Sequence, residues 1–178
     1  TDGLLPTGRS EWAGGGEVHV TVLQSAEEVA ERARRLPLAQ ERLRLRQEKE
    51  RAAAAAAGIA KLKEVLAEKE SASIIVATGV SQFQVLAVLA ESDLPWNKIT
   101  AFHLDEYVGL PITHEASFRK YLWERFVTQL PLPPAAFHFL DGEGDVEAEC
   151  DRVSELIAST TKDVAFVGVG ENGHLAFN

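Results

Sequence analysis

The hydrophobic positions after Glu70 fall into short apolar runs that alternate with longer amphipathic segments. This alternation is typical of β-α-β units, in which helices flank a parallel sheet. Runs rich in β-branched and aromatic residues predict strands at residues 73–77, 99–104, 137–140 and 163–169. The segments between them predict helices near residues 81–91, 117–130 and 145–160. We therefore expect an α/β fold with a doubly wound, mostly parallel, Rossmann-like sheet whose strands are covered on both faces.

The chain before Glu70 is less regular. Residues 1–16 contain turn-forming residues and a glycine run, which predicts a flexible leader. A single α/β domain is expected to occupy residues 17–178, with its first strand at 18–23. Within it, residues 32–51 carry eight basic and three acidic side chains. A basic run of this kind suits an RNA-binding arm, but its interleaved glutamates and the alanines that follow favour an inserted, solvated helix.

Composition narrows the function classes. The formal net charge of -9 disfavours nucleic acid and anionic membranes as partners, because both would repel an acidic surface. No apolar run approaches the roughly 18 residues of a membrane span, so a small soluble substrate is expected. Cys150 is the only cysteine and can form no internal disulfide, which fits the cytoplasm. The chain contains no methionine, so we expect it to be part of a longer product.

The first strand end of interest is the turn "ATGVSQ". In open parallel sheets, ligands bind beyond the carboxyl ends of the strands. The helix that follows this turn has free N-terminal amides and a positive dipole end, which attract anions such as phosphate. Taken alone, the turn is better explained by a structural role, with Ser81 as a helix cap and Gly79 in a tight turn. The residues concerned are Thr78, Gly79, Val80 and Ser81.

The second strand end is "HLDEYVGLP", which has Asp105 and Glu106 at the end of a central strand. Adjacent residues of an extended chain point to opposite sides, so only one carboxylate can face the cleft. A carboxylate that is partly shielded from water has a raised pKa and can serve as a general base. The simpler alternative is that Asp105 only caps the following turn.

The third strand end is "GVGENGHLAFN", in which a strand leads into a glycine-rich loop with one histidine. Gly168, Gly170 and Gly173 free the backbone and bring His174 to the same edge of the sheet. A lone histidine is more often structural than catalytic, but this setting favours a functional one. The remaining histidines lie in predicted strands or a polar loop and are expected to be structural or surface residues: His19, His103, His114 and His138.

The stretches "LDEYVGLP" and "GVGENGHLAFN" together resemble the glucosamine-6-phosphate deaminase family. These sugar-phosphate isomerases convert glucosamine 6-phosphate to fructose 6-phosphate and ammonia. The resemblance is close over residues 74–178, looser over 18–30 and 52–73, and absent from the leader. The "ATGVSQ" turn stands where the family has its phosphate loop. The related 6-phosphogluconolactonases share the sheet and a GxGxDGHxAS-type loop but lack the EYVG stretch, so a lactonase is the alternative.

The resemblance implies a role for each candidate residue. Asp105 matches the general base that moves a proton from C2 to C1 of the open-chain sugar. His174 matches the residue that assists ring opening, for which an imidazole suits because it both accepts and donates a proton near neutral pH. The turn from Thr78 to Ser81 matches the phosphate loop, and Gly168 would let the backbone approach the sugar. No metal or organic cofactor is implied, and the sequence shows no ligand cluster for one.

Two departures from the family pattern bear on activity. Asn172 stands where many members carry Asp, so the basicity of His174 is expected to be lower. The family pattern also continues beyond Asn178 into an acidic residue that assists the histidine and basic residues that hold the phosphate. We therefore expect an enzyme truncated at its C-terminus and inactive by itself, with a non-catalytic sugar-phosphate sensor as a second alternative. The preferred amino sugar and the number of subunits stay open, a homo-oligomer included.

Overall fold

The computed structural model describes residues 26–169 together with Gly173 and His174. The predicted leader at 1–16 and the predicted strand at 18–23 lie outside these residues. By its internal contacts, the chain divides into two compact units, Thr1–Gln47 and Glu48–Asn178. The candidate site residues all belong to the second unit.

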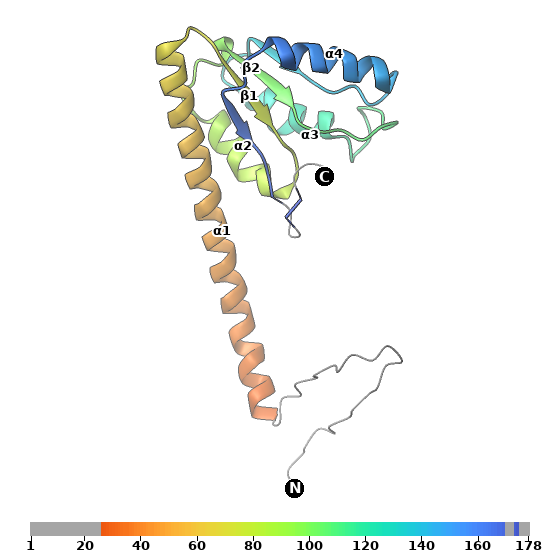
Figure 1. The fold of residues 1–178 in the computed structure, drawn as a ribbon. Helices are drawn as coiled ribbons and strands as arrows, with labels where there is room; N and C mark the ends of the chain where they lie inside the picture. Colours follow the sequence, from red (N-terminus) through yellow and green to blue (C-terminus); the bar gives the residue numbers. More distant parts are fainter. Residues whose placement is uncertain (1–25, 170–172, 175–178) are drawn as a thin grey trace, which may run out of the picture. The chain divides into compact units, whose positions relative to one another are not determined.

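Helix α1 (Ala26–Glu68) begins in the first unit and ends in the second (Figure 1). Residues 34–47 are all exposed. Glutamates pair with arginines one turn away, Glu31 with Arg35 at 2.7 Å and Glu41 with Arg44 at 2.7 Å. Exposed pairs of this kind add only about 0.3–0.5 kcal/mol each, so they support the helix weakly. The Arg-rich segment at 32–51 lies within α1 and is helical, as expected. No helix within the described residues is apolar enough over a sufficient length to cross a bilayer.

The second unit is built on a four-stranded parallel sheet with the order β3-β2-β1-β4. In register, Val76 of one central strand stands beside His103 and Phe166 of its two neighbours. The carboxyl ends of these strands therefore lie at one edge. The predicted strands are confirmed, although the last two are shorter than expected: β1 (Ala72–Val76), β2 (Ile99–His103), β3 (Ala136–His138) and β4 (Val164–Phe166).

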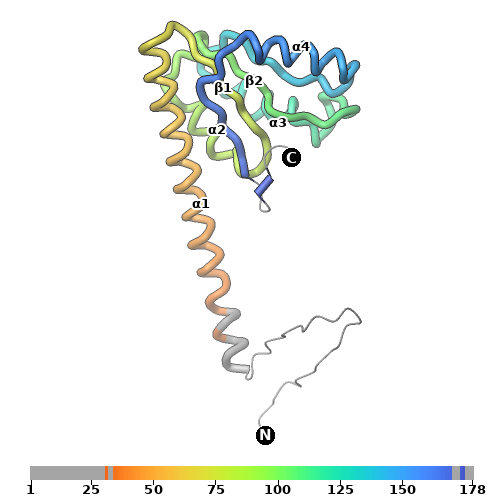
Figure 2. Tube along the Cα trace, viewed as in Figure 1, coloured from red at the N-terminus to blue at the C-terminus, as the bar shows by residue number. Residues whose placement is uncertain are grey.

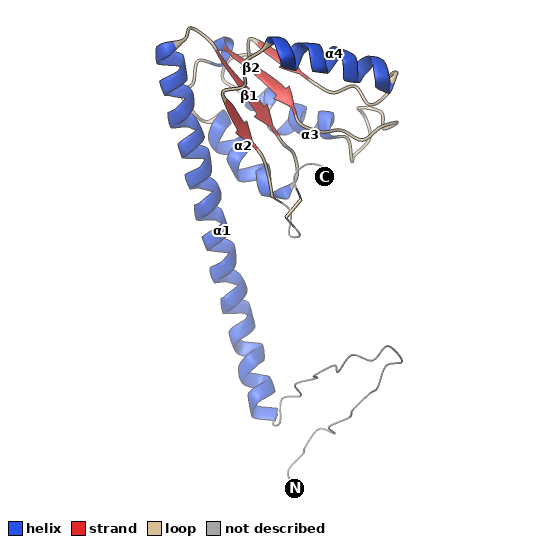
Figure 3. Ribbon diagram, viewed as in Figure 1, coloured by secondary structure: helices blue, strands red, loops and turns tan. Residues whose placement is uncertain are grey.

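Helices lie on both faces of this sheet. Figure 3 shows α2 (Phe83–Ala90) and α3 (Phe118–Arg125) behind the strands and α4 (Val146–Ser159) in front of them. The chain runs from β1 through β2 to β3 and then crosses back to β4 on the other side of β1, and right-handed crossovers in opposite directions put their helices on opposite faces. The doubly wound class is confirmed. Its switch point lies between β1 and β4, where such folds bind ligands.

Burial is nearly complete only in the central strands. β1 and β2 are buried at almost every position, whereas β3 is partly exposed throughout and β4 buries only Phe166. Among the described residues, α4 contributes no fully buried side chain. The expectation that the strands are covered on both faces therefore holds for the central pair and is wrong for β3 and β4.

The predicted helix at 117–130 is interrupted near its end. α3 stops at Arg125, and Val127–Gln129 forms a separate 3-10 turn. Phe126 between them leaves the helical conformation, with φ -131° and ψ -64°. Its ring is fully buried and meets Trp96 edge-on at 5.4 Å between ring centroids. The aromatic contact lies where the regular helix ends, and burial of this ring favours the departure of Phe126 from the helical conformation.

The last part of α1 packs on the sheet through small and aliphatic side chains. Ala55 and Leu62 are fully buried, and Val65 is nearly so. Gly58 lies on the same side of the helix, and a Cβ added to it would stand 2.2 Å from Cε1 of Phe166 in β4. The absence of a side chain at Gly58 therefore sets how closely α1 approaches the edge strand.

Polar contacts fix the amino end of the short strand β4. The carboxylate of Asp163 accepts the backbone N–H of Ser73 at 2.9 Å and pairs with Lys69 at 2.5 Å. The hydroxyl of Ser73 donates to the carbonyl of Thr161. These contacts hold β4 in register beside β1, and thereby place Gly168, which follows β4, at the switch point.

The contact between Gly58 and Phe166 gives a test of this packing. Gly58→Ala would normally stabilise a helix interior by about 1 kcal/mol. Here the added methyl group must displace a buried ring, so we expect the free energy of unfolding to fall by about 1–3 kcal/mol instead. The measurement is urea unfolding followed by circular dichroism.

Ala56→Gly is the matched control, because Ala56 is exposed on the same helix. It should cost only the ordinary helix propensity, about 1 kcal/mol. A more stable Gly58→Ala variant would show that α1 does not contact β4 as described.

Candidate active site

A pocket of about 290 Å³ opens at the carboxyl edge of the sheet, at the switch point. Its lining comes from the segments after β1, β2 and β4. Predicted site residues from each of the three segments contribute to it, namely Thr78, Gly79, Ser81, Asp105, Gly168 and His174. Figure 2 traces the blue segment after β4 beside the yellow-green segment after β1. Side chains nearly a hundred residues apart in the sequence therefore share one pocket.

The turn after β1 is held in an unusual backbone conformation. Gly79 has φ 98° and ψ 170°, a region that L-residues with side chains rarely adopt. Its carbonyl accepts the N–H of Gln82 at 3.0 Å and so starts the 3-10 turn Val80–Gln82, which leads into α2. Val80 itself does not line the pocket, and its side chain is 70% exposed. Gly79 and Ser81 of this turn line the pocket, and α2 begins at Phe83, two residues after the predicted start of the helix.

The segment after β4 passes very close to this turn. A Cβ added to Gly168 would stand 2.7 Å from the Oγ of Ser81 and 3.0 Å from Nε2 of Gln82. Any side chain at Gly168 would therefore push against the start of α2. Gly168 was predicted to let a ligand approach the backbone. It also allows the segment after β4 to lie close to the turn after β1.

Asp105 follows β2 and lines the pocket. Its Oδ1 is buried and has no hydrogen-bond partner within the described part of the chain. Loss of hydration raises the pKa of this carboxyl, and the nearby charge of Glu106 raises it further. A carboxylate with unused acceptor capacity and a raised pKa is suited to take a proton from a bound molecule.

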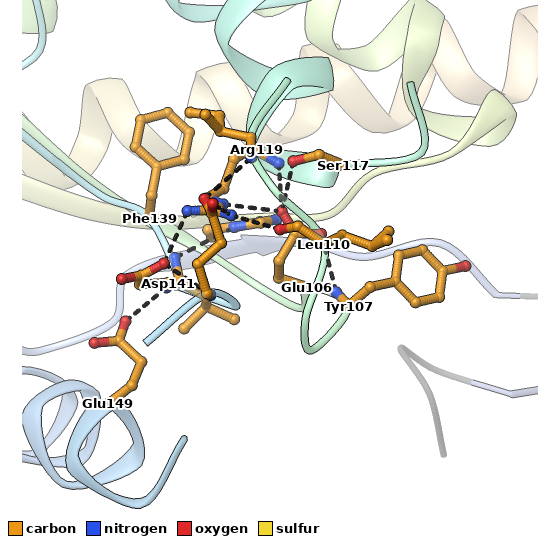
Figure 4. A network of polar contacts seen from close by, with 12 residues as sticks. Glu106, Tyr107, Leu110, Ser117, Arg119, Phe139, Asp141 and Glu149 are labelled. Atoms are coloured by element: carbon orange, nitrogen blue, oxygen red, sulfur yellow. Dashed lines mark hydrogen bonds and ion pairs between the residues drawn. The ribbon is translucent and has the colours of Figure 1, made fainter. Parts of the chain in front are cut away.

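Glu106 faces away from the pocket and does not line it, so the prediction that only one of the two carboxylates faces the cleft is confirmed. Its side chain is 2% exposed. It accepts hydrogen bonds from the N–H groups of Phe118 at 3.0 Å and Arg119 at 2.8 Å and from the hydroxyl of Ser117 at 3.0 Å (Figure 4). Burial opposes ionisation of Glu106, but these hydrogen bonds lower its pKa on balance. Glu106, rather than Asp105, accepts the N–H of Tyr107 in the following turn, and it also accepts two N–H groups at the start of α3, whose N-cap is Ser117.

Arg119 extends this network to the loop after β3. Its guanidinium is 8% exposed, and it pairs with Glu106 at 3.4 Å, with Asp141 at 2.9 Å and with Glu143 at 2.8 Å. It also donates to the carbonyl of Leu110 at 2.9 Å. These acidic partners lie 13 to 24 residues away in the chain, so no local spacing in the sequence marks them. Sequence reasoning missed the whole network.

His174 lines the pocket and is exposed. Asn172, the residue expected to orient it, lies outside the described residues. His103 is buried at the end of β2, where burial lowers its pKa to about 4, so it is neutral near pH 7. The structural or surface role expected for the other histidines is confirmed for the described ones, with His138 in β3 and His114 in an exposed loop, while His19 lies outside the description.

Aromatic residues complete the pocket and were not among the predicted site residues. Tyr107 and Phe118 both line it, and their rings stand 4.9 Å apart between centroids. Tyr107 belongs to the EYVG stretch and could have been identified from it. Phe118 could not, because only the fold of the loop after β2 brings the start of α3 to the pocket.

The chemical inventory of the pocket is hydroxyl groups, a helix N-terminus, a carboxylate and an imidazole. Neither lysine nor arginine is among its described lining residues. Within the same part of the chain, no three metal-ligating side chains gather into a possible metal site. The arrangement can bind an anion at the turn after β1 and transfer a proton at Asp105.

The sequence relatives are sugar-phosphate enzymes. The chain is 37% identical over 124 residues to glucosamine-6-phosphate deaminase 1 of Giardia intestinalis, a match that covers 66% of this chain and 47% of the relative. It is 41% identical over 88 residues to glucosamine-6-phosphate deaminase 1 of Pongo abelii, covering 48% of this chain and 30% of the relative. The chain thus spans about half the length of the curated relatives it matches, or less.

Solved structures with the same fold come from two enzyme types. A monomeric glucosamine-6-phosphate deaminase superposes with a TM-score of 0.63 at 30% identity, over 72% of this chain and 54% of that one. A 6-phosphogluconolactonase from Thermotoga maritima also has a TM-score of 0.63, at 27% identity, over 69% of this chain and 57% of that one. A family model described as glucosamine-6-phosphate isomerases/6-phosphogluconolactonase matches residues 46–177. Because this match covers most of its length, the chain belongs to the family of glucosamine-6-phosphate isomerases and 6-phosphogluconolactonases.

Proposed function

We propose that the complete protein is a glucosamine-6-phosphate deaminase, which converts glucosamine 6-phosphate and water to fructose 6-phosphate and ammonia. The observation that carries this proposal is the carboxylate of Asp105. It lines the same pocket as Thr78, Gly79 and Ser81, and its buried Oδ1 has no partner within the described residues. An unpaired carboxylate beside a sugar-sized cavity is costly to stability and is best explained by proton transfer.

Asp105 acts as the general base in this proposal. The proton on C2 becomes acidic only beside a carbonyl, so the sugar must first be in its open-chain form. Asp105 takes that proton while the C2–H electron pair forms a C1=C2 double bond and the C1=O π pair moves to O1, which gains a proton from solvent. Asp105 then returns its proton to C1 while the nitrogen lone pair forms a C2=N bond, which leaves an iminium ion at C2. Addition of water at C2, transfer of a proton from the added water to the nitrogen, departure of ammonia and loss of the remaining proton to solvent give the ketone. The raised pKa of Asp105 suits both the acceptance and the return of the proton.

His174 is proposed to assist ring opening by moving a proton at the ring oxygen. Its position in the same pocket as Asp105 supports this role. Asn172 would orient the imidazole through a hydrogen bond without adding charge. Gly168 would bring the backbone of the third segment close to the sugar, which its approach to Ser81 supports. These roles are carried from the family motif to the matching positions of this chain.

The turn from Thr78 to Ser81 is proposed to bind the phosphate. Gly79 gives the backbone the conformation needed for free amides to face an anion, and the hydroxyls of Thr78 and Ser81 add donors. The phosphate would anchor one end of the sugar while its reacting end meets Asp105. Val80 does not line the pocket in this structure, so its proposed part is limited to its backbone N–H at the edge of the turn.

The lactonase alternative rests on the likeness to the Thermotoga maritima structure. Hydrolysis of a lactone leaves the C2–H bond untouched and so needs no base at the position of Asp105. The deaminase is therefore the better proposal. We further propose that the protein is cytoplasmic and that its ligand is a phosphorylated amino sugar rather than nucleic acid or a membrane. Residues 17–178 are proposed to form one domain, with the helical insertion at 32–51. A homo-oligomer is a further proposal.

Removing the charge of Asp105 gives the sharpest test. In the complete protein, Asp105→Asn keeps the shape and should lower kcat for ammonia release at least about 100-fold, since a general base contributes 10²–10⁴-fold. The same change removes a buried charge, so the unfolding temperature should stay the same or rise. Ammonia release by a coupled assay and thermal unfolding are the two measurements.

Asp151→Asn is the control for this test, because Asp151 is exposed on α4. It should leave both measurements unchanged. Normal turnover by Asp105→Asn would sink the assignment of the base. A parent protein that binds the sugar phosphate without any turnover would support a sensor, and one that hydrolyses 6-phosphogluconolactone would support the lactonase.

The pH dependence follows from the direction of the pKa shift. Asp105 must be ionised to accept a proton, so kcat/KM should fall as the pH drops through its raised pKa. The midpoint of this acid limb should lie above about 3.9, the ordinary value for aspartate. It is measured with initial rates at each pH, while unfolding is monitored in parallel. A midpoint at or below the ordinary value would contradict the desolvated environment of Asp105.

Phosphate recognition can be tested with the dephosphorylated sugar. Glucosamine should bind roughly 100-fold more weakly than glucosamine 6-phosphate, because it lacks the charge that the turn would bind. Ser81→Ala should weaken the binding of glucosamine 6-phosphate only, and so reduce the difference in affinity between the two sugars. Ser154→Ala, an exposed site on α4, should not change it. Equal binding of the two sugars, measured by calorimetry, would exclude the turn as a phosphate site.

A further inference from the structure

We propose that Tyr121 is a positioning residue for phosphate recognition, acting through the backbone of Gly79. This inference rests on the proposed function, because it concerns the turn that is proposed to bind the phosphate. Tyr121 lies in α3 and does not line the pocket. Its hydroxyl donates a hydrogen bond to the carbonyl of Gly79 at 2.9 Å.

The hydrogen bond acts on the peptide group between Gly79 and Val80. Gly79 is the residue with φ 98°, so the backbone here lacks the steric restraint that a side chain would impose. The peptide bond after Gly79 is trans, as are all described peptide bonds. In a trans peptide the C=O and N–H point in opposite directions. By holding the carbonyl of Gly79 toward α3, Tyr121 directs the N–H of Val80 away from α3.

The other donor to this carbonyl cannot fix the orientation alone. The N–H of Gln82 also reaches the carbonyl of Gly79, at 3.0 Å, and closes the 3-10 turn. That contact belongs to the same short segment and moves with it. Tyr121 comes from a different helix, so it ties the turn to the rest of the fold. A binding site gains affinity when its donors are held in place before the ligand arrives.

The ring of Tyr121 is itself held firmly. It stacks on Phe83, the first residue of α2, with 5.5 Å between centroids and 18° between ring planes. The guanidinium of Arg125 lies 4.5 Å from the centroid of Phe83 and 5.7 Å from that of Tyr121. Burial raises the pKa of Tyr121 to about 12, so its hydroxyl keeps its proton and remains a donor. The donor is therefore both fixed in space and constant in charge.

The experiment uses Tyr121→Phe in the complete protein, because this variant removes the hydroxyl and keeps the ring stack. We expect KM for glucosamine 6-phosphate to rise about three- to tenfold, the effect of one lost hydrogen bond, with kcat within about twofold. Binding of unphosphorylated glucosamine should not change. A residue that only supported folding would lower stability and affect both sugars alike.

Trp123→Phe on the same helix is the matched control, because Trp123 is 53% exposed and its ring lies beside Phe139 rather than the turn. It should leave the KM for both sugars as in the parent. An unchanged KM in Tyr121→Phe, or an equal loss for both sugars, would overturn the proposal. If the parent releases no ammonia, the proposed deaminase fails, and the thermal shift by glucosamine 6-phosphate then tests Tyr121 separately: an equal shift in parent and variant would overturn its role.

Discussion

The geometry of the pocket depends on the buried carboxylate of Glu106. It collects hydrogen bonds from the first turn of α3 and an ion pair from Arg119, and it is the immediate neighbour of Asp105. The two residues are adjacent in the chain, and their side chains take different directions, with Asp105 lining the pocket and Glu106 not lining it. With Glu106 held against α3, Asp105 has to face the pocket. A buried carboxylate is tolerable here only because it has so many donors.

The contrast between these neighbouring carboxylates is the main electrostatic feature of the site. Hydrogen bonds lower the pKa of Glu106 despite its burial, whereas Asp105 has lost water at Oδ1 without a replacement in the described chain, and its pKa is raised. A buried polar group without a partner costs about 1–3 kcal/mol. Unfavourable features of this kind are concentrated at the functional sites of proteins, where they contribute to reactivity. Glu106 accepts several hydrogen bonds and is therefore a structural acid, whereas the Oδ1 of Asp105 accepts none within the described chain, which makes Asp105 the candidate catalytic acid.

Sequence patterns predicted the strands of the sheet and the candidate residues at their ends. They did not predict features that depend on contacts between residues far apart in the sequence. The apolar runs that became β1 and β2 are long and buried, so the signal for them was strong. The predicted helix at 117–130 was too long, because the burial of Phe126 against Trp96 is not visible in a local pattern. Asp105, Gly168 and His174 could be selected because each follows a strand. Arg119 and Tyr121 could not be, because their partners follow three different strands and only the folded chain brings them to α3.

This difference explains why no site residue was predicted on helix α3, although the helix and its N-cap contact Glu106, the pocket wall and the turn after β1. Ser117 and Arg119 hold Glu106, Phe118 forms part of the pocket wall, and Tyr121 holds the carbonyl of Gly79. None of these side chains occupies a strand end, the position where ligands of open α/β sheets are sought. The strand ends supply the groups that can contact a ligand, but residues beyond the end of a strand are no longer held by the hydrogen bonds of the sheet. α3 gives these groups a common support, so the relative position of the phosphate turn and Asp105 is set by one rigid helix.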